Sequence, residues 1–119
     1  TEVWGLGGMS SMAGPAYMRL TGSNYAEARS RTEKARMVSL GEHTFAPVPW
    51  EDMAAFPVGV DARKVVGYGI LPISHGGSAL RAGGQAGAGA AELPLECFKE
   101  GLRGIYAQAK EILAKEHEA

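Results

Sequence analysis

The chain lacks the residues that mark several classes of protein. Its 119 residues contain one cysteine, Cys97, so an internal disulfide and a CxxC metal site are both excluded. Lysine and arginine number 12 and aspartate and glutamate 13, which leaves a formal net charge of −1. Because there is no basic excess to attract phosphates, we expect no nucleic-acid partner.

Long apolar runs are also missing. The uncharged stretch at residues 3–18 is interrupted by several glycines and by Pro15, and it is shorter than the roughly 20 apolar residues of a spanning helix. We therefore expect a soluble protein without a membrane span. The single cysteine fits a reducing compartment, and Thr1 fits removal of an initiator methionine, so we expect a cytoplasmic location. A cleaved presequence for an organellar matrix would leave the same start.

Glycine and proline, in contrast, are abundant. The 17 glycines and 6 prolines make up about a fifth of the chain, against about 12% in average proteins. Ordered glycine costs more backbone entropy than other residues, so much of the chain should be turns, loops or extended segments. We expect a small single α+β domain over residues 1–119, with a short strand pair, two amphipathic helices and extensive Gly/Pro-rich irregular segments.

The N-terminal part, residues 1–22, is a Gly/Met-rich segment that we expect to be irregular. Pro15 can start one turn of helix there. Met9, Met12 and Met18 are adaptable side chains that suit an irregular apolar contact.

The first helix is predicted between Asn24 and Leu40. Asn24 and Glu27 are spaced as in a capping box, and Gly41 stands where a C-terminal cap belongs. Its basic residues should face solvent, with contact to an acidic partner or a phosphate as the alternative; they are Arg29, Arg31, Lys34 and Arg36. The side predicted to be buried consists of Tyr25, Ala28, Ala35, Val38 and Leu40.

The middle of the chain is predicted to be extended. Three prolines between residues 43 and 60 each remove a backbone donor, which favours an edge strand or a covering loop, with one helical turn over Trp50–Phe56. Residues 61–73 are the best strand candidate, because they are rich in β-branched and aromatic residues. Val58 and Val60 would pair with that strand as a hairpin.

Residues 75–93 are rich in glycine and alanine. This composition disfavours both a stable helix and a stable strand, so we predict a flexible connector. Alanine with spaced glycines could instead pack tightly against a neighbour.

The C-terminal helix, predicted over residues 94–117, carries the strongest periodic signal. Apolar residues recur at steps of three and four, so one side of the helix must be buried. We favour packing of this side on the protein's own sheet, with docking on another chain as the alternative. The predicted interaction face consists of Leu95, Phe98, Leu102, Ile105, Ala109 and Ile112.

A candidate ligand site follows the predicted strand at residues 75–78. A strand that leads into adjacent glycines and a short helical piece at 78–82 could direct backbone N–H groups at an anion. The Gly-x-Ser-x-Gly elbow of esterases is absent. The candidate ligand-binding residues are His75, Gly76, Gly77, Ser78 and Arg81.

Other chemistry has weaker support. The glycine-rich start lacks the third glycine of a dinucleotide-binding loop, and no P-loop string occurs. His43, His75 and His117 are far apart in sequence, so we expect no metal site and no cofactor. Cys97 begins the last helix, where a thiol can be activated, but we expect it to be a small buried apolar residue. We therefore predict no catalytic set, and His75 and Cys97 remain as candidate catalytic residues.

Two functions follow from these observations. Scattered apolar residues, extended segments and the lack of a matched catalytic set favour a non-enzymatic structural or protein-interaction subunit of a larger assembly. It would dock on a protein partner or a second copy through extended segments and the C-terminal helix. The alternative is a small ligand-binding domain or enzyme with an anion-binding loop at residues 75–78.

Overall fold

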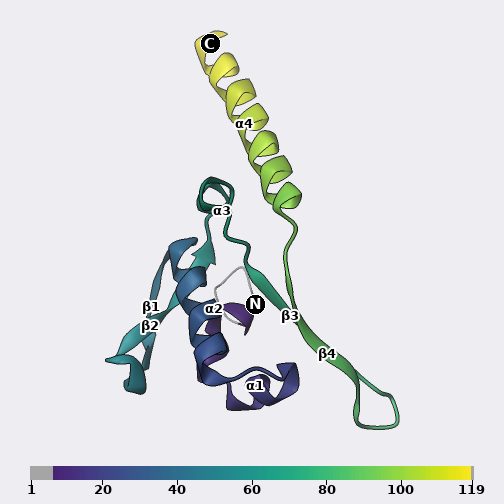
Figure 1. The fold of residues 1–119 in the computed structure, drawn as a ribbon. Coiled ribbons are helices and arrows are strands. Elements are labelled where there is room, and N and C mark those ends of the chain that lie inside the picture. Colours follow the sequence, from purple (N-terminus) through teal and green to yellow (C-terminus); the bar gives the residue numbers. More distant parts are fainter. Residues whose placement is uncertain (1–6, 119) are drawn as a thin grey trace.

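The computed structural model describes residues 7–118, which form helices and two separate antiparallel hairpins (Figure 1). The predicted α+β class is confirmed. The elements are η2 (Gly7–Ala13), α1 (Pro15–Thr21), α2 (Tyr25–Met37), β1 (Ser39–Val48), η3 (Pro49–Glu51), β2 (Ala54–Val60), α3 (Ala62–Tyr68), β3 (Ile73–Ala79), β4 (Gln85–Glu92) and α4 (Leu95–Glu118).

Helix α2 begins at the predicted capping box. The Asn24 side chain accepts a hydrogen bond from the Glu27 N–H at 3.0 Å, and Glu27 Oε2 accepts one from the Asn24 N–H at 3.0 Å. Two orphan N–H groups of the first turn are satisfied in this way. The predicted end at Gly41 is wrong. The helix is capped by Val38, because the backbone from Ser39 onward pairs with β2.

The hairpin of β1 and β2 confirms the extended structure predicted between residues 43 and 60. The helical turn predicted over 50–56 is wrong, since only η3 is helical and β2 starts at Ala54. Asp52 and Met53 take positive φ angles of 51° and 61°, which turn the chain between the strands. Trp50 lies at this turn with 60% of its surface exposed.

The strand predicted over residues 61–73 is wrong, because residues 62–68 form helix α3. The Asp61 side chain caps this helix by accepting a hydrogen bond from the Arg63 N–H at 2.9 Å. Gly69 ends the helix in the left-handed conformation, with φ at 66°. Val58 and Val60 therefore pair with β1 instead of with residues 65–71.

The core lies where η2 and α1 meet α2 and the first hairpin. It is built from Met12, Ala28, Val48 and Phe56, with Met18 packed against it. Helix α1 begins at Pro15 as predicted, and residues 7–13, expected to be irregular, form η2. The rest of the predicted N-terminal segment, residues 1–6, lies outside the described part of the chain.

The side of α2 that was predicted to be buried is confirmed in part. Ala28, Ala35 and Val38 are buried, whereas Tyr25 and Leu40 are 38% and 66% exposed. Leu40 is exposed because it belongs to β1 rather than to the helix. Sequence reasoning missed Thr32, which is fully buried and donates to the Ala28 carbonyl at 3.3 Å.

The flexible connector predicted at residues 75–93 is wrong. Residues 73–79 and 85–92 pair as the antiparallel strands β3 and β4. The Leu80 N–H donates to the Gly84 carbonyl at 3.0 Å and closes the turn. Gly83 and Gly84 adopt φ angles of 91° and 87°, which residues with a side chain rarely take.

The second hairpin and α4 project from the packed part of the chain (Figure 1). The radius of gyration is 17.6 Å, against about 13.5 Å for a compact chain of this length. The exposed surface is 7833 Å², against about 6,200 Å² for a compact protein of this mass. Within residues 7–118, no helix is both long and apolar enough to cross a bilayer.

Candidate functional site

Helix α4 leaves most of its apolar stripe uncovered. Leu95, Phe98 and Leu102 are half-buried where the first turns of α4 lie beside α3. Ala109 and the other outer positions of the stripe are exposed. The prediction that the stripe packs on the protein's own sheet is wrong. Among the described residues, the element that α4 contacts extensively is α3.

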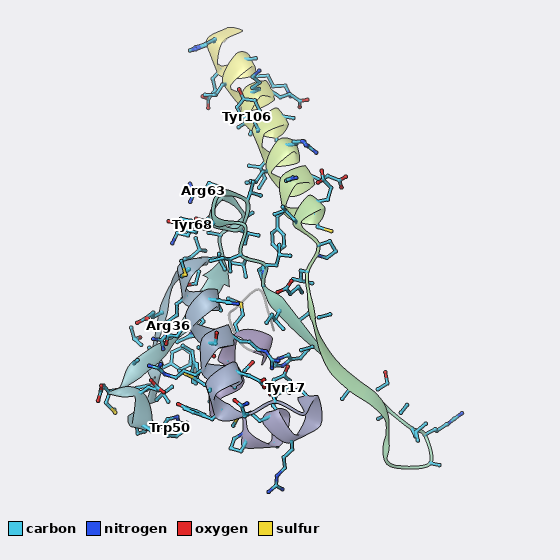
Figure 2. All side chains as sticks on the ribbon, in the orientation of Figure 1. Tyr17, Arg36, Trp50, Arg63, Tyr68 and Tyr106 are labelled. Atoms are coloured by element: carbon cyan, nitrogen blue, oxygen red, sulfur yellow. The ribbon has the colours of Figure 1, made fainter. Side chains whose placement is uncertain are left out.

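Four large apolar side chains form what we call the α4 outer face: Ile105, Tyr106, Ile112 and Leu113. Their exposed fractions are 63%, 64%, 58% and 56%. Tyr106 projects far from the packed helices that carry Tyr17 and Arg36 (Figure 2). Sequence reasoning missed Tyr106 and Leu113, although both lie one position beyond a predicted stripe residue and so border the same side of the helix.

The polar side chains of α4 interact with each other. Glu96 pairs with Lys99 at 3.3 Å and with Arg103 at 3.2 Å. The hydrogen bond from Lys99, followed by that from Arg103, lowers the pKa of the Glu96 carboxyl. Lys110 lies over the Tyr106 ring, 5.0 Å from its centre. These pairs stabilise the helix surface weakly and leave its apolar side uncovered.

Cys97 is exposed on α4, so the prediction of a small buried apolar residue is wrong. It follows Glu96 on the first turn, while His75 belongs to β3. Among the described residues, no three His, Cys, Asp or Glu side chains gather as a metal-binding group. Catalysis by either residue stays an untested prediction.

The candidate ligand residues at 75–78 lie within β3 rather than in a loop. They are opposite residues 87–90 of β4, and the helical piece predicted at 78–82 is wrong. In an antiparallel ladder, successive N–H groups point to opposite sides of the strand, so they do not converge on one anion. Arg81 is exposed at the turn. Ligand binding at these residues therefore loses its geometric basis and stays a prediction.

His75 makes a defined contact with the packed part. Its ring stacks on Tyr17 of α1, with ring centres 3.3 Å apart and an angle of 20° between the planes. Both side chains are half-buried. This contact anchors the hairpin near its base, while Gly76, Gly77 and Ser78 continue outward as exposed strand.

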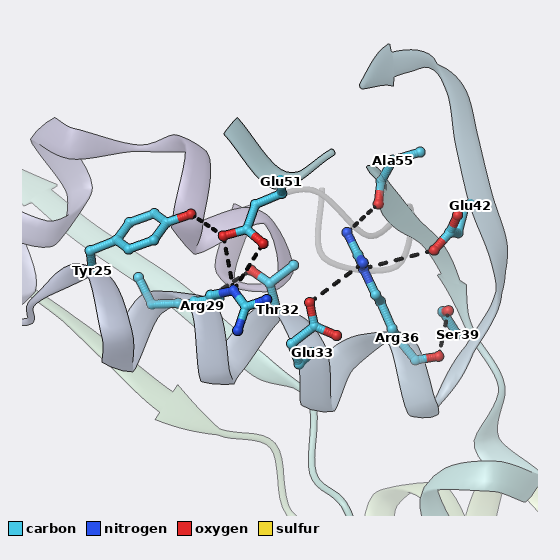
Figure 3. A network of polar contacts seen from close by, with 10 residues as sticks. Tyr25, Arg29, Thr32, Glu33, Arg36, Ser39, Glu42, Glu51 and Ala55 are labelled. Carbon is cyan, nitrogen blue, oxygen red and sulfur yellow. Dashed lines mark hydrogen bonds and ion pairs between the residues drawn. The ribbon is translucent and has the colours of Figure 1, made fainter. Parts of the chain in front are cut away.

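A polar network attaches the first hairpin to α2 (Figure 3). Arg29 Nε donates to both carboxylate oxygens of Glu51 at 2.9 Å, and the Tyr25 hydroxyl donates to the same carboxylate. The hydrogen bonds from Tyr25 and then Arg29 lower the pKa of the Glu51 carboxyl. Arg36 Nη2 donates to the Ala55 carbonyl at 2.6 Å. These contacts fix the hairpin on the helix.

A cavity of about 290 Å³ lies between α2 and the segment that joins α3 to β3. Arg31 and Lys34, one helical turn apart on α2, contribute its positive charges, and Glu92 contributes a negative one. Arg31 Nη1 is buried and has no hydrogen-bond partner. The remaining lining residues are Met9, Ala35, Gly69, Ile70, Leu71, Pro72 and Ile73.

Sequence reasoning placed Arg31 and Lys34 on the solvent side of the helix, which holds for the exposed Lys34 but not for the half-buried Arg31. A local signal was present, because Arg31 stands three residues after the buried Ala28 and four before the buried Ala35. A residue at both spacings lies beside the buried side of its helix. Helical spacing could not identify the segment that faces Arg31 across the cavity. That segment is residues 69–73, which were predicted to belong to a strand.

Comparisons with known proteins give related sequences and a related structure. The chain is 33% identical over 108 residues to oxamate carbamoyltransferase subunit AllG of Escherichia coli (strain K12), an alignment that covers 88% of this chain and 26% of AllG. It is 32% identical over 106 residues to the uncharacterized protein YahG of the same organism, covering 87% of this chain and 22% of YahG. No protein-family model matches the sequence.

A solved structure shares the fold. The crystal structure of a conserved protein of unknown function from Enterococcus faecalis V583 matches with a TM-score of 0.77 and 30% sequence identity. The match covers 89% of this chain and 26% of that one. The chain thus spans about a quarter of the length of the proteins that it resembles.

Proposed function

We propose that this chain is a non-enzymatic docking part of a larger protein assembly of the carbamoyltransferase type. The name of one relative, AllG, describes a subunit of oxamate carbamoyltransferase. The relatives continue well beyond the region that matches this chain. We propose that the projecting elements, the second hairpin and α4, pack on another protein chain of such an assembly. That chain would correspond to the part of the relatives that lies outside the matched region.

The observation that carries the proposal is the α4 outer face. Its four side chains are each more than half exposed, and all lie within about 120° of the helix circumference. Scattered exposed apolar residues are ordinary, but a contiguous apolar side on a projecting helix is typical of a protein interface. An amphipathic helix that lays its apolar side into a groove is a common mode of recognition.

The second hairpin offers a different kind of contact. It is two strands wide, so the outer backbone of both β3 and β4 is free of a neighbouring strand among the described residues. A Cβ atom built on Gly76, Gly87 or Gly89 would meet nothing within 4 Å. Open strand edges with small residues allow another backbone to approach closely and add a strand.

The surface area is consistent with docking. The exposed surface exceeds that of a compact protein of equal mass by more than the about 800 Å² that one partner contributes to a standard interface. The second hairpin and α4, which project from the packed part, contribute to this exposed surface (Figure 1). Contact with a partner would remove the apolar side chains of the α4 outer face from water, which supplies a driving force for assembly.

The test compares two charged variants of α4 in the native protein, purified without a tag and analysed by size-exclusion chromatography. The double variant Ile105→Glu, Ile112→Glu puts two carboxylates on the outer face and should elute at the size of the chain alone. Ala107→Glu, on the opposite side of the helix, should still elute with the assembly. Both variants should keep the thermal midpoint of the isolated chain, because α4 lies outside the core.

Two results would contradict the proposal. One is a native protein that travels as a compact monomer and unfolds in one cooperative step that includes α4. The other is a double variant that assembles as well as Ala107→Glu does.

A further inference from the structure

We propose that the cavity between α2 and residues 69–73 binds a small organic monocarboxylate. The cavity is separate from the α4 outer face, and this inference does not depend on the assembly role. It rests on a buried guanidinium nitrogen without a partner, on the balance of charge around the cavity and on its apolar walls.

The unpartnered nitrogen is the first observation. Buried polar groups are nearly always hydrogen-bonded, and a buried N–H of a charged group without a partner is costly. Arg31 Nη1 is buried, and Arg31 lines the cavity. A carboxylate oxygen placed there would accept a charge-assisted hydrogen bond from Nη1 and remove that cost.

The charge balance selects the ligand. Arg31 and Lys34 each carry one positive charge, and Glu92 carries one negative charge, so the lining has a net charge of +1. A single carboxylate neutralises this charge. A phosphate with nearly two negative charges would leave an excess negative charge in the cavity, and it has no apolar part to contact the walls.

The walls indicate the rest of the ligand. Met9, Ala35, Ile70, Leu71 and Ile73 make much of the lining apolar. A volume of about 290 Å³ is at the small end of ligand pockets. A short branched aliphatic chain attached to the carboxylate would contact these walls and bury apolar surface.

The wall opposite α2 is held in place by the second hairpin. The Leu93 N–H donates to the Pro72 carbonyl at 2.9 Å, and Pro72 is fully buried. Glu92 is opposite Ile73 in the ladder. The acidic residue and the apolar wall are therefore fixed relative to each other, which preorganises the cavity for a ligand.

The experiment titrates the full chain with 3-methylbutanoate and follows backbone amide resonances by NMR. Saturable shifts should be confined to the segments that line the cavity, around Met9, residues 31–35 and 69–73, and Glu92. The neutral analogue 3-methylbutanamide should bind at least about tenfold more weakly, because it lacks the charge that strengthens the bond to Arg31. Inorganic phosphate should also bind more weakly than the carboxylate.

Arg31→Gln should weaken the binding of 3-methylbutanoate by about tenfold or more. The matched control, Arg103→Gln, removes a guanidinium from α4 far from the cavity and should leave the affinity unchanged. Circular dichroism and the thermal midpoint establish that both variants are folded. If Arg31→Gln unfolds, Lys34→Gln takes its place, since Lys34 is exposed on the same side of α2.

The proposal is overturned by any of the following results. These are an absence of saturable shifts at millimolar 3-methylbutanoate, equal affinity for the acid and the amide, and tighter binding of phosphate than of the carboxylate. Unchanged affinity in a folded Arg31→Gln variant also overturns it.

Discussion

The two parts of this chain treat their apolar residues in opposite ways. In residues 7–68, Met12 is 1% exposed and Val65 is fully buried. In residues 73–118, Ile105 and Ile112 are 63% and 58% exposed, although they lie on the apolar stripe of the 24-residue helix α4. One part has its own core, and the other has an apolar side without a covering layer.

The difference shows what periodicity can and cannot tell. A stripe of apolar residues indicates that one side of a helix is suited to burial. Whether that side is covered by the same chain depends on long-range contacts that the stripe does not specify. In α2 the covering elements are η2 and the first hairpin, whereas in α4 only the first turns lie beside α3. The four predictions below test this contrast between the packed and the projecting part.

The largest effect is expected from truncating the core. Met12→Ala should lower the free energy of unfolding by about 2–5 kcal/mol, because it removes buried methylene groups and leaves a cavity. Leu113→Ala, on the α4 outer face, should change it by less than about 0.5 kcal/mol in the isolated chain. Urea denaturation of the two variants measures both values. Equal losses would mean that α4 is packed against a core of its own.

A smaller effect is expected at the start of α2. Asn24→Ala removes the side chain that caps the helix and should cost about 1 kcal/mol of global stability. Asn24→Ser is the matched control, because serine is also a good cap. Thermal unfolding followed by circular dichroism compares the two. A midpoint that drops equally in both variants would contradict the role assigned to the cap.

A local gain is expected in α4. Gly101 is exposed within the helix and has open space around it, so Gly101→Ala should stabilise the helix by up to about 1 kcal/mol. Since α4 lies outside the core, the thermal midpoint of the packed part should not move. Hydrogen exchange should slow in residues 99–117 alone. A rise in the midpoint of the whole chain would show that the two parts unfold together.

The last effect is confined to acidic pH. Asp61 is 7% exposed, and its hydrogen bond with Arg63 lowers the pKa of its carboxyl to about 2. The stabilising contribution is fully present above the unfolded pKa of about 3.9, and it is lost as the pH falls through about 2. Urea denaturation at several pH values measures the free energy of unfolding. Between about pH 5 and about pH 2, this free energy should fall less for Asp61→Asn than for the wild type. Parallel profiles would contradict this assignment.

The sequence predicted elements whose signals are local. The Asn24 and Glu27 capping box and the long stripe of the last helix were found because both ends of each interaction lie a few residues apart. Helix α3 was missed because Val65, Val66 and Tyr68 favour strands, while the cap from Asp61 and the end at Gly69 decide for a helix. Composition also misled at β3 and β4, since a ladder of backbone hydrogen bonds orders glycine and alanine as strands there.

The candidate sites show the same difference between contacts that are local in the sequence and contacts that are not. Ile105 and Ile112 of the α4 outer face were predicted from the sequence, because helical spacing places them on one stripe, whereas Tyr106 and Leu113 at the border of the stripe were missed. The cavity could not, because Arg31 meets Ile73 and Glu92 only after residues 61–73 have folded as a helix and a turn.

Hydrogen exchange of α4 tests the central claim most directly. In the isolated chain, amides of residues 105–117 should exchange much faster than those of α2, and in the native assembly they should become as slow as those of α2. Slow exchange of these residues in the isolated monomeric chain would contradict the account, because α4 would then be stable without a partner.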